Sequence, residues 1–205
     1  LDLTSNISFV TKKPTTYALL RGRNIKTYVI NPVSIEFVDE SFISTSTKSI
    51  FIKNERIACQ QISNMNKEQR LVFSYIPKNY VLGNSCNFIA CENNTYGIDI
   101  FYLLALLNSP ILNWYFKLNS SNNHVSNYEI GEFPIPTTPK SLIKEISETM
   151  KRYLDSREQG LINKINSLSS CVNSSSWKEK GFDVFSNQCI PDISKKTSDF
   201  IQHLS

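Results

Sequence analysis

Residues 96–136 read YGIDIFYLLALLNSPILNWYFKLNSSNNHVSNYEIGEFPIP, and the two helices that this stretch predicts decide the fold. Residues 98–107 are apolar nearly all round, which is typical of a buried helix rather than of an amphipathic surface helix. An interruption follows, where Ser109 is a good helix cap and Pro110 suits the first position of a helix. The second predicted helix carries further apolar residues, namely Ile111, Leu112, Trp114, Tyr115 and Leu118.

The second predicted helix leads directly into a loop of small polar residues, 119–127. This loop has one histidine, no acidic residue, and Val125 as its only apolar residue. A large apolar anchor followed by such a loop indicates a rigid support that presents polar side chains. The side chains that we expect it to present are Ser120, Ser121, Asn122, Asn123 and His124.

The composition sets broad limits on fold and partner. The 205 residues, of which 40% are hydrophobic, suffice for one domain of ordinary size plus an appendage. A formal charge of +4 does not by itself indicate a nucleic-acid partner. The longest apolar run, residues 100–107, is far shorter than the roughly 20 residues of a membrane span, so we expect no membrane partner. Because residue 1 is a leucine, we expect a piece of a longer protein.

The cysteines point to a reducing compartment. Their spacing matches neither a disulfide framework nor a zinc site, and the chain has only two histidines as further metal ligands. No signal-peptide pattern opens the sequence. We therefore expect reduced thiols, a cytoplasmic location and no metal site. The five cysteines are Cys59, Cys86, Cys91, Cys171 and Cys189.

A basic stretch precedes most of the expected strands. Residues 12–26 hold five basic side chains and no acidic one, namely Lys12, Lys13, Arg21, Arg23 and Lys26. Gly22 permits a tight turn that holds two guanidinium groups close together. Arginine is well shaped for phosphates and for the guanine edge, so these five residues are candidate contacts to a DNA backbone. A solvated turn is the ordinary alternative for an isolated Arg-Gly-Arg.

Residues 27–91 have the β-branched and aromatic character of strands. We expect strands over residues 28–30, 34–38, 50–52, 57–62, 71–76 and 87–91, and another within residues 1–11. Asn-Pro, Lys-Asn-Glu and Gly-Asn turn signals separate them. The pattern predicts an α+β fold: a curved mixed or antiparallel sheet with packed helices, followed by a C-terminal helical segment.

Residues 56–64, RIACQQISN, are unusually polar for a strand of this length. Glutamine and asparagine can form bidentate hydrogen bonds with adenine, which makes Gln60, Gln61 and Asn64 candidate base readers. Polar groups at a strand edge or in a turn are the more common explanation of such residues.

The last third of the chain has a different character. Apolar residues recur at helical spacing between residues 137 and 170, charges of both signs occupy the other face, and Gly160 is a candidate break. Mixed charges fit a solvated or protein-facing surface better than one that follows DNA. After a Ser- and Asn-rich stretch we expect a last helix over residues 191–204. The sequence thus divides into a domain that holds the candidate DNA contacts, residues 1–139, and a helical arm with its tail, residues 140–205.

Signatures of catalysis are nearly absent. The chain has 6 glycines and no glycine-rich phosphate loop, and neither a methyltransferase motif nor a nuclease motif is complete. Two alternatives to DNA binding stay open. One is a small hydrolase that uses Cys59 or Cys86 with His124, and the other is a protein-interaction module that uses the helix over residues 140–168.

Four segments in this order resemble the TaqI-like C-terminal specificity domain. They are LLRGRNIK (residues 19–26), RIACQQIS (56–63), LLALLNSPILNWYF (103–116) and EFPIP (132–136). Domains of this family are the target-recognition parts of type II restriction–modification enzymes. Similar domains make up the specificity subunits of type I systems.

The resemblance implies a module that binds double-stranded DNA sequence-specifically and has no catalytic site or cofactor of its own. It implies a bacterial, cytoplasmic parent enzyme in which nuclease and adenine methyltransferase modules are fused to this one. Those modules would use Mg²⁺ and S-adenosylmethionine. Because the family's base-contacting residues vary with the recognised sequence, none is carried over onto this chain.

Overall fold

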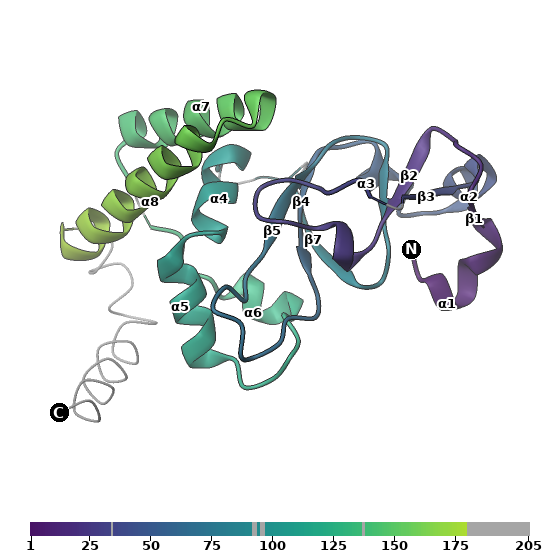
Figure 1. Cartoon of the computed structure of the whole chain (residues 1–205), viewed down its shortest axis with the longest axis horizontal. Helices are drawn as coiled ribbons and strands as arrows, with labels where there is room; N and C mark the ends of the chain where they lie inside the picture. Colours follow the sequence, from purple (N-terminus) through teal and green to yellow (C-terminus); the bar gives the residue numbers. More distant parts are fainter. Residues whose placement is uncertain (34, 92–93, 95–96, 137, 180–205) are drawn as a thin grey trace.

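The computed structural model describes residues 1–33, 35–91, 94, 97–136 and 138–179, without the side chains of residues 4 and 170–179. These residues form two small sheets and a layer of helices, which confirms the predicted α+β fold with mixed and antiparallel strands. Figure 1 shows the helical layer at one end of the molecule, the four-stranded sheet at the other end, and the three-stranded sheet between them. In the described part of the chain no helix is long and apolar enough to cross a membrane.

The four-stranded sheet has the order β1-β3-β2-β6, and it is mixed because β2 and β6 are parallel while the other neighbours are antiparallel. Its strands are β1 (Val10–Thr11), β2 (Tyr17–Leu20), β3 (Glu36–Val38) and β6 (Tyr80–Leu82). Short helices adjoin these strands in the chain, namely α1 (Leu3–Asn6), η1 (Ile7–Phe9), η2 (Gly22–Asn24), α2 (Glu40–Thr45) and α3 (Ser49–Ile52). Ile43 of α2 and Ile52 of α3 pack on the sheet residues Leu19, Val38 and Val81, which gives this end its own small core.

The three-stranded sheet is antiparallel and has β4 (Arg56–Gln60) between β5 (Phe73–Ile76) and β7 (Cys86–Ala90). Successive side chains of a strand point to opposite faces, and β4 is buried on both. Ile57 and Cys59 belong to the main core, which the helices cover. Ala58 faces the opposite side, where it packs with Leu20 of β2 and with Ile25, which follows η2. The strand β4 therefore joins the two ends of the molecule.

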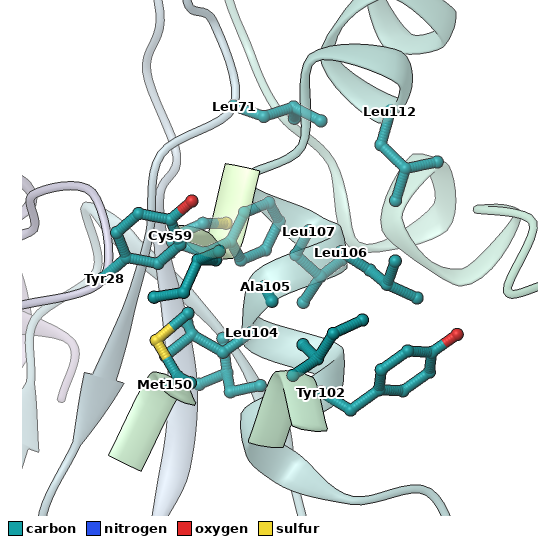
Figure 2. Packing of buried hydrophobic residues seen from close by; sticks show 14 of the residues in the cluster. Tyr28, Cys59, Leu71, Tyr102, Leu104, Ala105, Leu106, Leu107, Leu112 and Met150 are labelled. Atoms are coloured by element: carbon teal, nitrogen blue, oxygen red, sulfur yellow. The ribbon is translucent and has the colours of Figure 1, made fainter. Parts of the chain in front are cut away.

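The two helices expected in residues 98–119 form as the sequence indicates. Helix α4 (Ile100–Leu107) is capped by Asp99, whose carboxylate accepts from the N–H groups of Phe101 and Tyr102. Helix α5 (Pro110–Asn119) begins with its proline after the Ser109 cap. Figure 2 shows α4 surrounded by core side chains, and residues 104–107 are at most 1% exposed.

The helical arm packs against α4. Helix α7 (Lys140–Ser156) and helix α8 (Gln159–Glu179) contribute to the main core the residues Ile146, Met150, Tyr153, Leu161 and Ile165. The break between these helices falls at Arg157, which adopts a left-handed conformation, and not at Gly160 as expected. The apolar stripe that the sequence predicts in this segment is therefore buried against the main core of the same chain.

Two buried asparagines fix the helices to the start of β5 and to the residues just before it, beside the Tyr28 main chain that pairs with β5 at Phe73 and Tyr75. The side chain of Asn108 accepts from the N–H of Phe73 at 2.9 Å and donates to the carbonyl of the same residue at 3.0 Å. One turn further, Asn113 accepts from the N–H groups of Arg70 and Leu71 at 2.8 and 3.1 Å. The two amides therefore pair buried backbone groups of residues 70, 71 and 73 that would otherwise lack a partner.

Three of the expected strands are wrong. Residues 1–11 are mostly α1 and η1, residues 50–52 lie in α3, and residues 28–30 make only isolated bridges. Tyr28 has a φ of 69°, which lies outside the β region. Ile52 lies in the one-turn helix α3, and its side chain packs in the small core. Strand propensity depends on the surface against which the residue packs, and short runs do not reveal that surface. The expected helix over residues 191–204 lies outside the described residues.

We predict that Asn108→Ala lowers the free energy of unfolding by about 3 kcal/mol. The variant leaves the buried N–H of Phe73 without its partner, and an unpaired buried polar group costs about 1–3 kcal/mol. Urea denaturation followed by circular dichroism measures the change. The matched control is Asn119→Ala at the exposed end of α5, which we expect to change stability by less than about 0.5 kcal/mol. Equal effects of the two variants would contradict the structural role of Asn108.

Candidate functional site

Three of the segments singled out in the sequence meet on one face. They are the basic turn (residues 21–26), the segment that follows β4 (residues 60–65) and the polar loop (residues 120–124). We call these three segments together the loop surface. A hollow of about 350 Å³ lies within it and is lined by Arg21, Gly22, Arg23, Gln60, Ile62 and Ser85.

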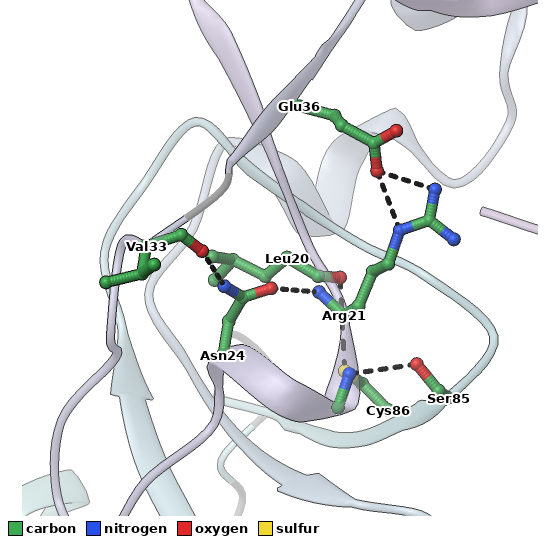
Figure 3. A network of polar contacts seen from close by, with 8 residues as sticks. Leu20, Arg21, Asn24, Val33, Glu36, Ser85 and Cys86 are labelled. Atoms are coloured by element: carbon green, nitrogen blue, oxygen red, sulfur yellow. Dashed lines mark hydrogen bonds and ion pairs between the residues drawn. The ribbon is translucent and has the colours of Figure 1, made fainter.

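The basic turn is held rigidly by one buried asparagine. The side chain of Asn24 accepts from the N–H of Arg21 at 2.9 Å and donates to the carbonyls of Asn31 and Val33, as Figure 3 shows in part. The N–H of Gly22 donates to Ser85 Oγ at 2.8 Å. A Cβ at Gly22 would come within 2.9 Å of the Ser85 carbonyl oxygen, so this close approach requires glycine.

The basic residues of the turn differ in their exposure. Arg21 is half-buried and forms a two-point contact with Glu36, at 2.8 Å from Nε and 2.6 Å from Nη2 (Figure 3). Much of its charge is therefore balanced within the protein. Arg23 and Lys26 are exposed on the same turn. Lys12 and Lys13 follow β1, the outer strand of the four-stranded sheet, and the structure does not bring them to the loop surface.

Main-chain hydrogen bonds join the segment after β4 to the polar loop. The N–H of Ser63 donates to the carbonyl of Asn123 at 2.8 Å, and the N–H of Val125 donates to the carbonyl of Gln61 at the same distance. Ile62 and His124 form an antiparallel bridge between these two bonds. The loop surface is thus a short continuation of β-pairing beyond the end of β4.

A buried arginine that the sequence analysis missed holds the polar loop from beneath. The Arg70 guanidinium donates from Nη1 to the carbonyl of Ser120 at 3.2 Å and from Nη2 to the carbonyl of Asn122, and its Cζ lies 4.6 Å from the centre of the Phe116 ring. Arg70 is only 2% exposed, and burial lowers its pKa, although an arginine stays protonated in proteins. One signal was present in the sequence: a charged residue directly before the apolar run of residues 71–73.

The predicted readers fall into two groups. Several amides build the surface: Gln60 donates to the carbonyl of Ile25 at 2.8 Å, and the side chains of Asn64, Asn122 and Asn123 accept from nearby N–H groups. Ser120 is buried and Gln61 is half-buried. Ser121 and His124 are exposed on the polar loop, so they are the candidates whose side chains face solvent.

Burial of the two candidate cysteines disfavours the hydrolase alternative. Burial raises the pKa of Cys59 to about 12 and that of Cys86 to about 11, whereas a nucleophilic cysteine needs a lowered pKa. His124 is exposed on the polar loop. Among the described residues no group of three or more His, Cys, Asp or Glu side chains could hold a metal ion.

Comparison with known proteins identifies relatives. The model of the TaqI-like C-terminal specificity domain matches residues 17–135. Among solved structures, the type IIL restriction–modification enzyme MmeI in complex with DNA is similar, with a TM-score of 0.53 and 12% identity over 86% of this chain. The chain spans 29% of the length of MmeI. No curated protein sequence matches the chain.

We predict that Arg70→Met loosens the polar loop without unfolding the domain. The variant removes two hydrogen bonds from a charged donor, each contributing about 1.5–3 kcal/mol, while methionine keeps much of the apolar volume. Hydrogen exchange should therefore accelerate by about 10- to 100-fold at the amides of Ser63 and Met65, which bond to Asn123. Mass spectrometry of the exchanged peptides measures these exchange rates.

The control for this experiment is Lys67→Met, which removes an exposed cation three residues before Arg70. We expect it to leave the exchange of Ser63 and Met65 unchanged. Exchange in α7 reports global unfolding and should be the same in both variants. Unaltered exchange in Arg70→Met would contradict its role as a support.

Proposed function

Because the chain belongs to the TaqI-like C-terminal specificity domain family, we propose that it recognises a DNA target sequence for a restriction–modification enzyme. The observation that carries the proposal is the convergence of the basic turn, the segment after β4 and the polar loop on one rigid surface. The similarity in fold to MmeI, which was solved with DNA bound, supports it.

The basic turn would supply affinity. Phosphate contacts by exposed lysines and arginines release counterions, fix the register of a protein on the duplex, and carry no sequence information themselves. Arg23 and Lys26 are exposed, whereas Arg21 is engaged by Glu36. We therefore propose Arg23 and Lys26 as the principal phosphate contacts of the turn, with Arg21 as an additional contact that first has to share its charge with Glu36. Lys12 and Lys13 would contact the backbone only where the DNA extends to β1.

The polar loop would supply sequence selectivity. Base edges in the major groove are distinguished by donors, acceptors and the thymine methyl group, and short side chains on a rigid support can match such a pattern. Ser121 and His124 are exposed on a loop whose main chain Arg70 and the Gln61–Ser63 segment hold in place. Gln60, Gln61, Asn64, Ser120, Asn122 and Asn123 would shape this surface, and their amides could exchange an internal bond for a base contact.

The parent protein would contain more than this module. We propose that nuclease and adenine methyltransferase modules precede or accompany it, and that S-adenosylmethionine and Mg²⁺ are used there. Residues 1–139 would make the DNA contacts, while the helical arm (residues 140–205) supports the domain and faces other modules. The packing of α7 and α8 on α4 and the mixed charges of α7 favour this division over a separate protein-interaction module.

We predict that duplex binding by the chain weakens steeply with salt and that Arg23→Ala/Lys26→Ala reduces this dependence. Two lost phosphate contacts should lower the slope of log K against log salt by about 1.8, since each contact contributes about 0.9. Fluorescence anisotropy across a salt series measures the slope. The matched control, Lys144→Ala/Arg152→Ala on the exposed face of α7, removes the same charge and should leave the slope nearly unchanged. If the control flattens it as much as the test variant, the turn is not the backbone contact.

We predict that His124→Ala relaxes base preference at one position of the recognised site. Loss of one base contact typically reduces discrimination by about 1–3 kcal/mol. Duplexes selected from a random pool by wild type and variant reveal the change at that position. A matched control is Asn127→Ala, an exposed residue that begins helix α6 (Asn127–Gly131), which should leave the selected sequence unaltered. Equal loss of affinity for selected and random duplexes would show that His124 is not a reader.

A further inference from the structure

Two large apolar side chains stand exposed within the otherwise polar loop surface. Ile62 is 59% exposed and Met65 is 44% exposed. Isolated exposed apolar residues are common on proteins and need no explanation by themselves. Here, however, both belong to the segment that carries the main-chain bonds to the polar loop.

The backbone of Ile62 is fixed on both sides. Its neighbours Gln61 and Ser63 bond to Val125 and Asn123, and Ile62 itself bridges to His124. A β-branched side chain has few rotamers, so little conformational freedom is left for this residue to lose when a ligand binds. The apolar group is therefore held in position before any partner arrives.

The hollow beside Ile62 is lined by both apolar and cationic side chains. Ile62 lines the hollow of about 350 Å³ together with Gln60 and with the turn residues Arg21 and Arg23. A purely apolar partner would not match the guanidinium groups, and a purely ionic partner would leave Ile62 in water. The complementary ligand carries anionic groups beside one small apolar group.

We infer that Ile62 contacts the 5-methyl group of a thymine in the recognised DNA, with Met65 extending the apolar contact. This inference rests on the DNA-binding function proposed above. Thymine is the one standard base that presents a methyl group in the major groove, and apolar side chains are its usual partners. The phosphates that flank it supply the negative charge that Arg23 and Lys26 attract.

Replacing thymine by uracil removes only that methyl group and tests the contact directly. Using the duplex selected by the wild-type chain, each thymine is replaced singly by uracil, and binding is measured by anisotropy. We expect one position at which the loss is about 4-fold, the effect of burying one methyl-sized group. Ile62→Ala should bind the thymine duplex about as weakly as wild type binds the uracil duplex, and should no longer distinguish the two.

The matched control is Ile50→Ala, which removes an equally exposed isoleucine (56%) from α3 beside the other sheet. It should retain the full thymine preference. The inference is overturned if no thymine position is sensitive, if the selected site has no thymine, or if Ile62→Ala keeps the preference. Insertion of Ile62 between bases is another such outcome, because the variant would then lose affinity equally for both duplexes. If the wild-type chain selects no sequence at all, the proposed function itself fails.

Discussion

The structure depends on two amide side chains that bond the buried backbone leading into β5. Strand β5 is the outer strand of its sheet; Asn108 bonds its first residue, Phe73, and Asn113 bonds the preceding residues Glu68, Arg70 and Leu71. A helix packed on a sheet edge by apolar contacts alone could slide, because apolar contacts have no direction. Hydrogen bonds to defined backbone groups fix both the position and the rotation of α4 and α5.

The same short segment of chain also supports the polar loop. The backbone N–H of Arg70 donates to the Asn113 side chain, and its guanidinium donates to the carbonyls of Ser120 and Asn122. The position of α5 against residues 68–71 therefore determines where the polar loop meets the segment after β4. The backbones of Ile62 and His124 form part of this support, whereas the side chains of Ile62, Ser121 and His124 are exposed on it. Their replacement can alter what the surface recognises while the fold stays intact.

The sequence predicted best the parts whose signals are local. The caps at Ser109 and Pro110, the wholly apolar α4 and the amphipathic α7 were evident because helical caps and periodicity lie within a few residues. The one-turn helix α3 and the missed strands β2 and β6 depend on distant partners: β2 pairs in parallel with β6, about sixty residues away along the chain. At the loop surface, composition singled out the three segments, but it did not predict that they meet. It could not reveal that Arg21 pairs with Glu36, that Gln60 bonds to the main chain, or that the buried Arg70 holds the loop.

The central claim is that the loop surface, and not the helical arm or the outer strand β1, touches DNA bases. Photocrosslinking tests it most directly, with 5-iodouracil replacing thymine in duplexes selected by the full chain and the crosslinked peptides identified by mass spectrometry. The account predicts crosslinks within residues 60–65 and 120–124. Crosslinks confined to α7, α8 or the residues around β1 would contradict it.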